Sequence, residues 1–94
     1  MNIEAQNMDV AEFLITNPKY REILERAVAA EERLEKGDPL RAALGWEWHD
    51  VQAYPANLVK LVVSGIARVA YKSNSGTMYL LVDRSAVKQA LKKR

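Results

Sequence analysis

The chain has 94 residues, about half of them hydrophobic, and it contains no cysteine. Chains of about 100 residues rarely divide into two cores, so we expect a single domain spanning residues 1–94. The lack of cysteine excludes disulfides, thiolate metal sites and cysteine nucleophiles from this chain.

The formal net charge of +2 conceals an uneven distribution of charge. Residues 1–50 hold 6 Lys/Arg and 11 Asp/Glu, a net charge of −5. Residues 51–94 hold 8 Lys/Arg and 1 Asp/Glu, a net charge of +7. The basic half is suited to meeting a polyanion while the acidic half stays away from it; the alternative is that the acidic helices are simply solvated faces.

The first ten residues, MNIEAQNMDV, are polar and acidic and do not resemble a signal peptide. No apolar run approaches the roughly 20 residues that a bilayer span needs. The longest, residues 58–70, is interrupted by Lys60, Ser64, Gly65 and Arg68. We therefore expect a soluble, cytoplasmic protein with no membrane partner.

Two helices are predicted in the first 36 residues. Residues 1–8 lack periodicity and are expected to be disordered. Asp9 is a suitable N-cap for a short helix that ends at Asn17, because a proline follows. A second helix is predicted over residues 18–36, with Gly37 as its C-cap and apolar residues at three- and four-residue spacing on one stripe: Tyr20, Ile23, Leu24, Ala27, Val28 and Leu34.

A third helix is predicted to begin at Asp38 and Pro39 and to end at Gly45. Its apolar positions are Leu40, Ala43 and Leu44. The segment DPLRAALG resembles the first helix of a helix-turn-helix, in which small alanines let a second helix cross closely.

Residues 46–54 are the least regular part of the chain and are predicted to hold either a helical turn or a short strand. One of Trp46 and Trp48 is expected to be buried and the other partly exposed, where it can stack on a base or a partner. His49 and Asp50 are interpreted as a surface or capping pair. A single histidine without cysteine does not make a usual metal site, and neither a nucleophile motif nor a glycine-rich phosphate loop is present. We therefore expect no enzyme, no catalytic residue, no metal and no cofactor.

A helix followed directly by a hairpin is predicted over residues 55–82. The helix covers residues 55–64, Gly65 ends it, and strands cover residues 66–72 and 77–82. Asn74 and Gly76 are expected to supply the positive φ that a hairpin loop favours.

A final helix begins at Arg84, with Ser85 as its cap and Ala86, Val87, Ala90 and Leu91 on its apolar face. This face is expected to pack beside the helix of residues 18–36, either within one chain or across a two-fold axis. The second arrangement is a homodimer through the N-terminal and C-terminal helices.

The segments PLRAALG, LVKLVVSG and IARVAYK-SNSG-TMYLLV together resemble the winged helix-turn-helix superfamily of DNA-binding domains, over residues 38–82. The resemblance implies an α+β fold in which helices precede a two-stranded hairpin wing. Residues 9–36 would be N-terminal helices and residues 84–94 a C-terminal helix.

In that superfamily the central helix commonly enters the major groove and the wing reaches neighbouring backbone or minor groove. The resemblance therefore implies two sets of DNA-binding candidates. On the helix side these are Gln52, Tyr54, Asn57, Lys60 and Ser64. On the wing they are Arg68, Lys72, Ser73, Asn74 and Ser75.

The resemblance therefore implies a non-enzymatic module for double-stranded DNA, such as a small transcriptional regulator or a DNA-processing accessory domain, associated with the nucleoid. The alternative is a winged helix that binds another protein within a nucleic-acid-processing assembly. An exposed ridge of Val59 and Val63 favours the alternative. A continuous basic face that joins Lys60, Arg68, Lys72 and Lys88 favours DNA.

Overall fold

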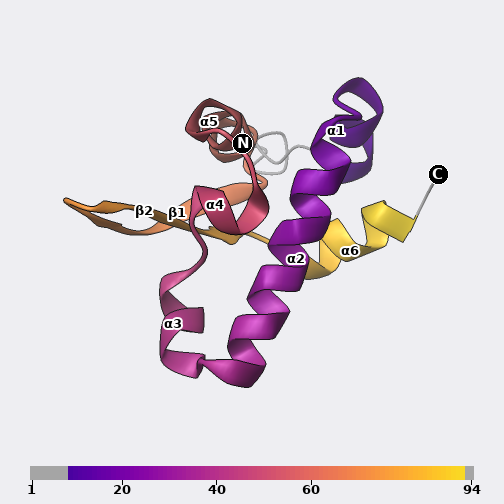
Figure 1. Cartoon of the computed structure of the whole chain (residues 1–94). Helices are drawn as coiled ribbons and strands as arrows, with labels where there is room; N and C mark the ends of the chain where they lie inside the picture. The colour runs from indigo at the N-terminus through magenta and orange to yellow at the C-terminus, as the bar shows by residue number, and fades with distance from the viewer. Residues whose placement is uncertain (1–8, 93–94) are drawn as a thin grey trace, which may run out of the picture.

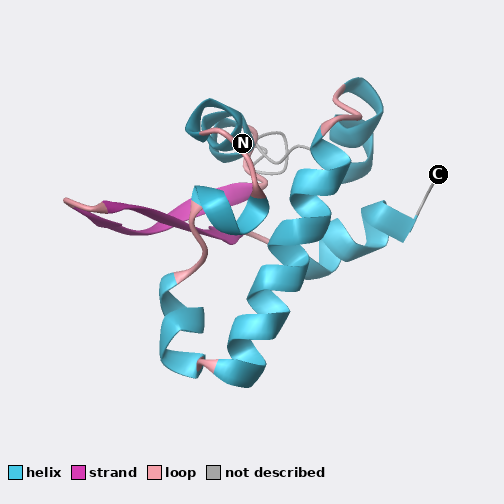
Figure 2. Ribbon diagram, viewed as in Figure 1, coloured by secondary structure: helices cyan, strands magenta, loops and turns pink. Residues whose placement is uncertain are grey.

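The computed structural model describes residues 9–92, which form an α+β domain of six helices and one antiparallel hairpin (Figure 1, Figure 2). The predictions for residues 1–8 and for Lys93 and Arg94 lie outside these residues. In chain order the elements are α1 (Val10–Thr16), α2 (Tyr20–Gly37), α3 (Pro39–Leu44), α4 (Trp48–Val51), α5 (Pro55–Val63), β1 (Ala67–Ser73), β2 (Gly76–Leu81) and α6 (Arg84–Lys92).

The first two helices form where the sequence predicts them, but Gly37 is the last residue of α2 and Asp38 is its C-cap, so the predicted cap at Gly37 is wrong. The carboxylate of Asp9 accepts a hydrogen bond of 3.0 Å from the backbone N–H of Ala11, as an N-cap does. Helix α2 begins two residues after Pro18, at Tyr20, whose ring packs edge-to-face on Phe13 with centroids 5.3 Å apart. This contact joins α1 to α2 at their common corner.

The buried stripe of α2 differs from the prediction at its C-terminal end. The five predicted residues from Tyr20 to Val28 are buried, but Leu34 is half-buried. Ala30 and Glu31 are buried instead. The stripe therefore includes a carboxylate, which needs hydrogen-bond partners to be buried at low cost.

Helix α3 begins as predicted but packs differently. Asp38 caps it, because its side chain accepts a 3.2 Å hydrogen bond from the N–H of Arg41. Its three apolar positions do not enter the core: Leu40 is 86% exposed, and Ala43 and Leu44 are also exposed. The helix lies against α2 and the hairpin, while the short helix α4 directly precedes α5. The helix that immediately precedes α5 is thus α4 rather than residues 38–45.

Trp46 is fully buried and Trp48 is half-exposed, which confirms the prediction that one tryptophan is buried and the other partly exposed. The backbone of Trp46 forms a single antiparallel bridge with Tyr79, through hydrogen bonds of 2.9 and 2.8 Å. The two rings stack with centroids 5.5 Å apart. Residues 46–54 therefore contain both of the predicted alternatives, a one-residue strand contact and the helical turn α4.

Two backbone positions around α4 have positive φ. Gly45 has φ 104° and ψ −168°, a region that residues other than glycine essentially do not populate. A Cβ atom on Gly45 would also overlap the carbonyl oxygen of Tyr79. Gln52, at the end of α4, is left-handed with φ 55°, which is unusual for a residue other than glycine, asparagine or aspartate.

Helix α5 and the hairpin agree with the predicted boundaries to within one residue. Leu58 and Leu61 are buried, each stabilising the fold by about 1.5–3 kcal/mol. Gly65 follows α5 with φ 79°, which confirms its role as the glycine exit. The expectation of positive φ at Asn74 and Gly76 is wrong, because neither has it; the hydroxyl of Ser73 instead accepts a 3.3 Å hydrogen bond from the N–H of Ser75.

Helix α6 packs against α1 and α2 of the same chain. Its cap is Asp83, whose side chain accepts a 3.0 Å hydrogen bond from the N–H of Ala86, so the predicted cap at Ser85 is wrong. Val87 and Ala90 are buried on the predicted apolar face. Within one chain, α6 thus covers the stripe that a second copy would cover in the expected dimer.

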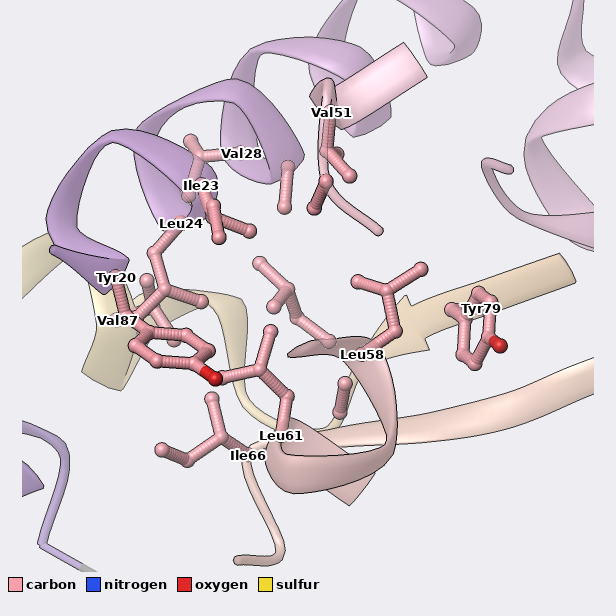
Figure 3. Close-up of a cluster of buried hydrophobic side chains, with 14 of the residues drawn as sticks. Tyr20, Ile23, Leu24, Val28, Val51, Leu58, Leu61, Ile66, Tyr79 and Val87 are labelled. Atoms are coloured by element: carbon pink, nitrogen blue, oxygen red, sulfur yellow. The ribbon is translucent and has the colours of Figure 1, made fainter. Parts of the chain in front are cut away.

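The core lies where α2, α5, the base of the hairpin and α6 meet (Figure 3). In this view Leu24 and Val87 lie near Tyr20, and Leu58 lies beside Tyr79. At the edge of the core, Oε2 of Glu31 accepts hydrogen bonds from the indole Nε1 of Trp46 (3.0 Å) and the backbone N–H of Leu81 (2.6 Å). Nη1 of Arg84 lies 3.4 Å from the other carboxylate oxygen.

Replacing Gly45 should test the close approach to Tyr79. We expect Gly45→Ala to lower the free energy of unfolding by at least about 2 kcal/mol, since backbone strain of about 1–3 kcal/mol adds to the clash with the Tyr79 carbonyl. Urea denaturation followed by circular dichroism measures the change. Gly37→Ala is the matched control, because no atom lies within 4 Å of the added Cβ; an equal loss in both variants would contradict the assignment.

Removing the Glu31 carboxylate should be costly. Glu31→Ala leaves the Trp46 indole and the Leu81 N–H without their acceptor, and each unsatisfied buried donor costs about 1–3 kcal/mol. We expect a loss of at least about 2 kcal/mol in urea unfolding. Glu25→Ala, on the exposed face of α2, should change the stability by less than about 0.5 kcal/mol. Similar values for the two variants would refute the role of Glu31.

Candidate functional site

The outward side of α5 is formed by four residues, Ala56, Val59, Lys60 and Val63, which we call the α5 face. All four are exposed, with Val59 at 56% and Val63 at 80%. They recur at three- and four-residue intervals, so they lie on one side of the helix, opposite the buried Leu58 and Leu61. The α5 face is therefore an aliphatic ridge with a single cation.

The other predicted residues on this helix face inward or lie at its end. The carboxamide oxygen of Asn57 accepts a 3.1 Å hydrogen bond from the hydroxyl of Tyr20, and the residue is half-buried. Ser64 is the half-buried C-cap, and its N–H bonds the carbonyl of Lys60 at 2.9 Å. Of the polar candidates on α5, Lys60 is thus the one on the outward side.

Gln52 and Tyr54 lie together just before α5, and both are exposed. With Trp48, His49 and Ala53 they line an open depression of about 380 Å³. This depression is mainly apolar.

A β-bulge separates the two cations of β1. Val69 pairs with Tyr79 but Tyr71 pairs with Met78, so Ala70 is the extra residue of β1. Since side chains alternate along a strand, one extra residue reverses the side on which the following residues lie. Lys72 pairs with Thr77 and lies on the Tyr79 side of the hairpin.

Arg68, before the bulge, pairs with Leu80 and lies on the opposite side. The register therefore does not give Arg68 and Lys72 one common side. The other predicted residues, Ser73, Asn74 and Ser75, are exposed at the tip of the hairpin, which projects beyond the helices (Figure 2). The hydroxyls of Ser73 and Ser75 are 3.0 Å apart.

The electrostatic character of this region is uniform. Residues 52–82 contain Lys60, Arg68 and Lys72 but no Asp or Glu, a net charge of +3. Among the residues that the structure describes, none of these three cations forms an ion pair. The surface of α5 and the hairpin therefore combines aliphatic groups with unneutralised positive charge.

Lys88, by contrast, is neutralised within the fold. Its Nζ lies 2.6 Å from Oε2 of Glu32, and α6 lies on the other side of α2 from the hairpin tip (Figure 1). The hydrogen bond from Lys88 is the main reason that the pKa of Glu32 is below its ordinary value. Arg84 is similarly bound, 3.0 Å from Glu35, and this hydrogen bond raises its pKa. The basic surface of the hairpin therefore does not continue to Lys88.

The histidine lies in a small polar cluster at α4. Oδ2 of Asp50 accepts a 2.9 Å hydrogen bond from the N–H of Glu47, so the capping interpretation of Asp50 is confirmed. Nε2 of the exposed His49 lies 3.3 Å from Oε1 of Glu47. In residues 9–92 no group of three or more His, Cys, Asp or Glu side chains could hold a metal ion.

Within the same residues, no helix has both the length and the apolar character of a membrane span.

Comparisons of the chain with protein-family models, with curated protein sequences and with solved structures give no significant match.

Two features of this surface were not predicted. The bulge at Ala70 has no signal in the sequence, because Ala70 continues an ordinary strand pattern. The depression beside Tyr54 is lined in part by the left-handed Gln52, and no glycine or asparagine marks that position. The absence of carboxylates from residues 52–82 is, however, readable from the sequence.

The pairing of Lys88 can be tested through the titration of Glu32. A carboxyl whose pKa is lower in the folded state stabilises the fold above its unfolded pKa, and this contribution is lost as the pH falls through the folded pKa. In Lys88→Met we expect the pKa of Glu32, measured by carboxyl NMR, to rise toward its ordinary value. Lys92→Met is the control and should leave it unchanged. An unaltered pKa in Lys88→Met would show that Lys88 is free for other contacts.

Proposed function

We propose that this domain is a winged-helix-like docking module that binds another protein through the α5 face. The element order supports the fold assignment, since the helical turn α4, the helix α5 and the hairpin follow one another as the second and third helices and the wing do in that superfamily. The bridge from Trp46 to Tyr79 adds a one-residue third strand beside β2.

The observation that carries the proposal is the exposure of Val59 and Val63 on adjacent turns of one helix. A helix at the surface of a domain normally carries polar residues on its outward side. Helix α5 has apolar residues on both sides, which is typical of a helix covered on both sides. A partner that covers the α5 face would remove this aliphatic ridge from water.

Double-stranded DNA is the second candidate, and the charge of residues 52–82 favours it. Three cations without a carboxylate can neutralise phosphates, and Tyr54, Gln52 and Ser73 can donate hydrogen bonds to them. The α5 face itself offers one polar group, Lys60, to base edges, and valines offer contact only to thymine methyl groups. This face is therefore better suited to a protein than to the major groove.

Site-specific photo-cross-linking should distinguish the two candidates. We expect a benzophenone amino acid at position 63 to give discrete protein adducts in the cells from which the protein comes, and nuclease should not alter them. The same group at position 15 is the matched control, since Ile15 is 77% exposed on α1. The adducts should be lost when Val59 is changed to Ser in the labelled protein.

Two results would overturn docking. One is the same adducts from positions 63 and 15, or none from either position. The other is steep salt-dependent binding of a random-sequence duplex, measured by fluorescence anisotropy, with a smaller salt slope in Lys60→Ala and in Lys72→Ala. That second result would establish the DNA candidate.

A further inference from the structure

We infer that the partner of the α5 face is an acidic amphipathic helix, an inference that rests on the proposed docking function. The starting observation is the spacing of the apolar residues. Ala56, Val59 and Val63 are separated by three and then four residues, the spacing by which one helix packs along another. From Ala56 to Val63 the ridge is about 10 Å long, so it would contact two to three turns of a partner helix.

An extended partner is less suited to this surface. Such a segment would add to an edge of the two-stranded hairpin, and the edge of β2 is already bridged to Trp46 at Tyr79, which leaves β1 as the longer edge. That strand is interrupted by the bulge at Ala70 and carries Arg68 and Lys72, and bulges and charges are the features that protect an edge from pairing. The hairpin therefore does not offer a regular seven-residue template for a strand.

A second copy of this chain is also unsuitable. A two-fold contact through the α5 face would place the same surface on both sides, so Lys60 of one copy would approach Lys60 of the other. Residues 52–82 supply no carboxylate to offset this repulsion. Like charges brought together at an interface are unfavourable, so two copies of this chain should not associate through the α5 face.

Charge complementarity identifies the occupant. Lys60 is part of the α5 face, and Lys72 is exposed on β1, the hairpin strand that packs against α5. Neither has a carboxylate partner in the described part of the chain. A helix with leucine-like residues on one side and Asp or Glu beside them would cover the ridge and neutralise both lysines.

Designed peptides test this inference directly. The first is a 16-residue helix with Leu at three- and four-residue spacing and Glu at the remaining positions. The second has Lys in place of Glu, and the third has the composition of the first in a scrambled order without an apolar side. Binding is followed by backbone amide chemical shifts of the isotopically labelled protein, which also report whether each variant is folded.

We expect the acidic amphipathic peptide to shift the amides of Val59, Lys60 and Val63, and to bind at least about 10-fold more tightly than the Lys version or the scrambled peptide. The double variant Lys60→Glu/Lys72→Glu should reverse the preference between the acidic and basic peptides. Arg68→Glu, with the same kind of charge change on the opposite side of the hairpin, should retain the acidic preference.

Equal binding of the acidic and basic peptides, equal binding of the scrambled peptide, or shifts elsewhere on the protein would each overturn the inference. If the peptides fail while cross-links from position 63 remain specific, the partner has a different chemistry and the docking function stands. If position 63 also gives no specific adduct, the proposed function falls with it.

Discussion

The buried carboxylate of Glu31 is the contact on which the arrangement of the other elements depends. It is placed by α2, and its oxygens accept hydrogen bonds from the Trp46 indole, from the Leu81 backbone at the end of β2 and from Arg84 at the start of α6. A carboxylate is expensive to bury unless such partners surround it. One side chain therefore fixes the base of the hairpin, the buried tryptophan and the C-terminal helix against the longest helix.

Local chemistry made much of the fold predictable. The Asp9 and Asp38 caps and the glycine exit at Gly65 depend on neighbours in sequence, and each forms as predicted. The apolar spacing of α2 likewise predicts its buried stripe, except at Leu34. The exposure of Leu40 was not predictable in this way. It depends on how α3 lies against α2 and the hairpin, which the periodicity of a six-residue helix does not determine.

The candidate site likewise combines features that sequence neighbours determine with features that depend on tertiary packing. The sequence placed Val59 and Val63 on one side of a helix, and left open whether that side was covered. The sides of Arg68 and Lys72 depend on the bulge at Ala70, a feature of strand pairing rather than of residue type. The role of Glu31 was not predictable from the sequence either, because its partners Leu81 and Arg84 lie 50 and 53 residues further along the chain.

The attachment of the hairpin at its base has a consequence for local opening. Near the helices, β2 is held by the Trp46 bridge and by Glu31, contacts that form only between distant parts of the chain. Near the tip, the strands hold each other and little else, and their side chains are mostly exposed or half-buried. Amides at the tip can therefore exchange with solvent through local fraying, whereas those near Leu81 should exchange only when most of the domain unfolds. A single hairpin thus contains both weakly and strongly protected backbone.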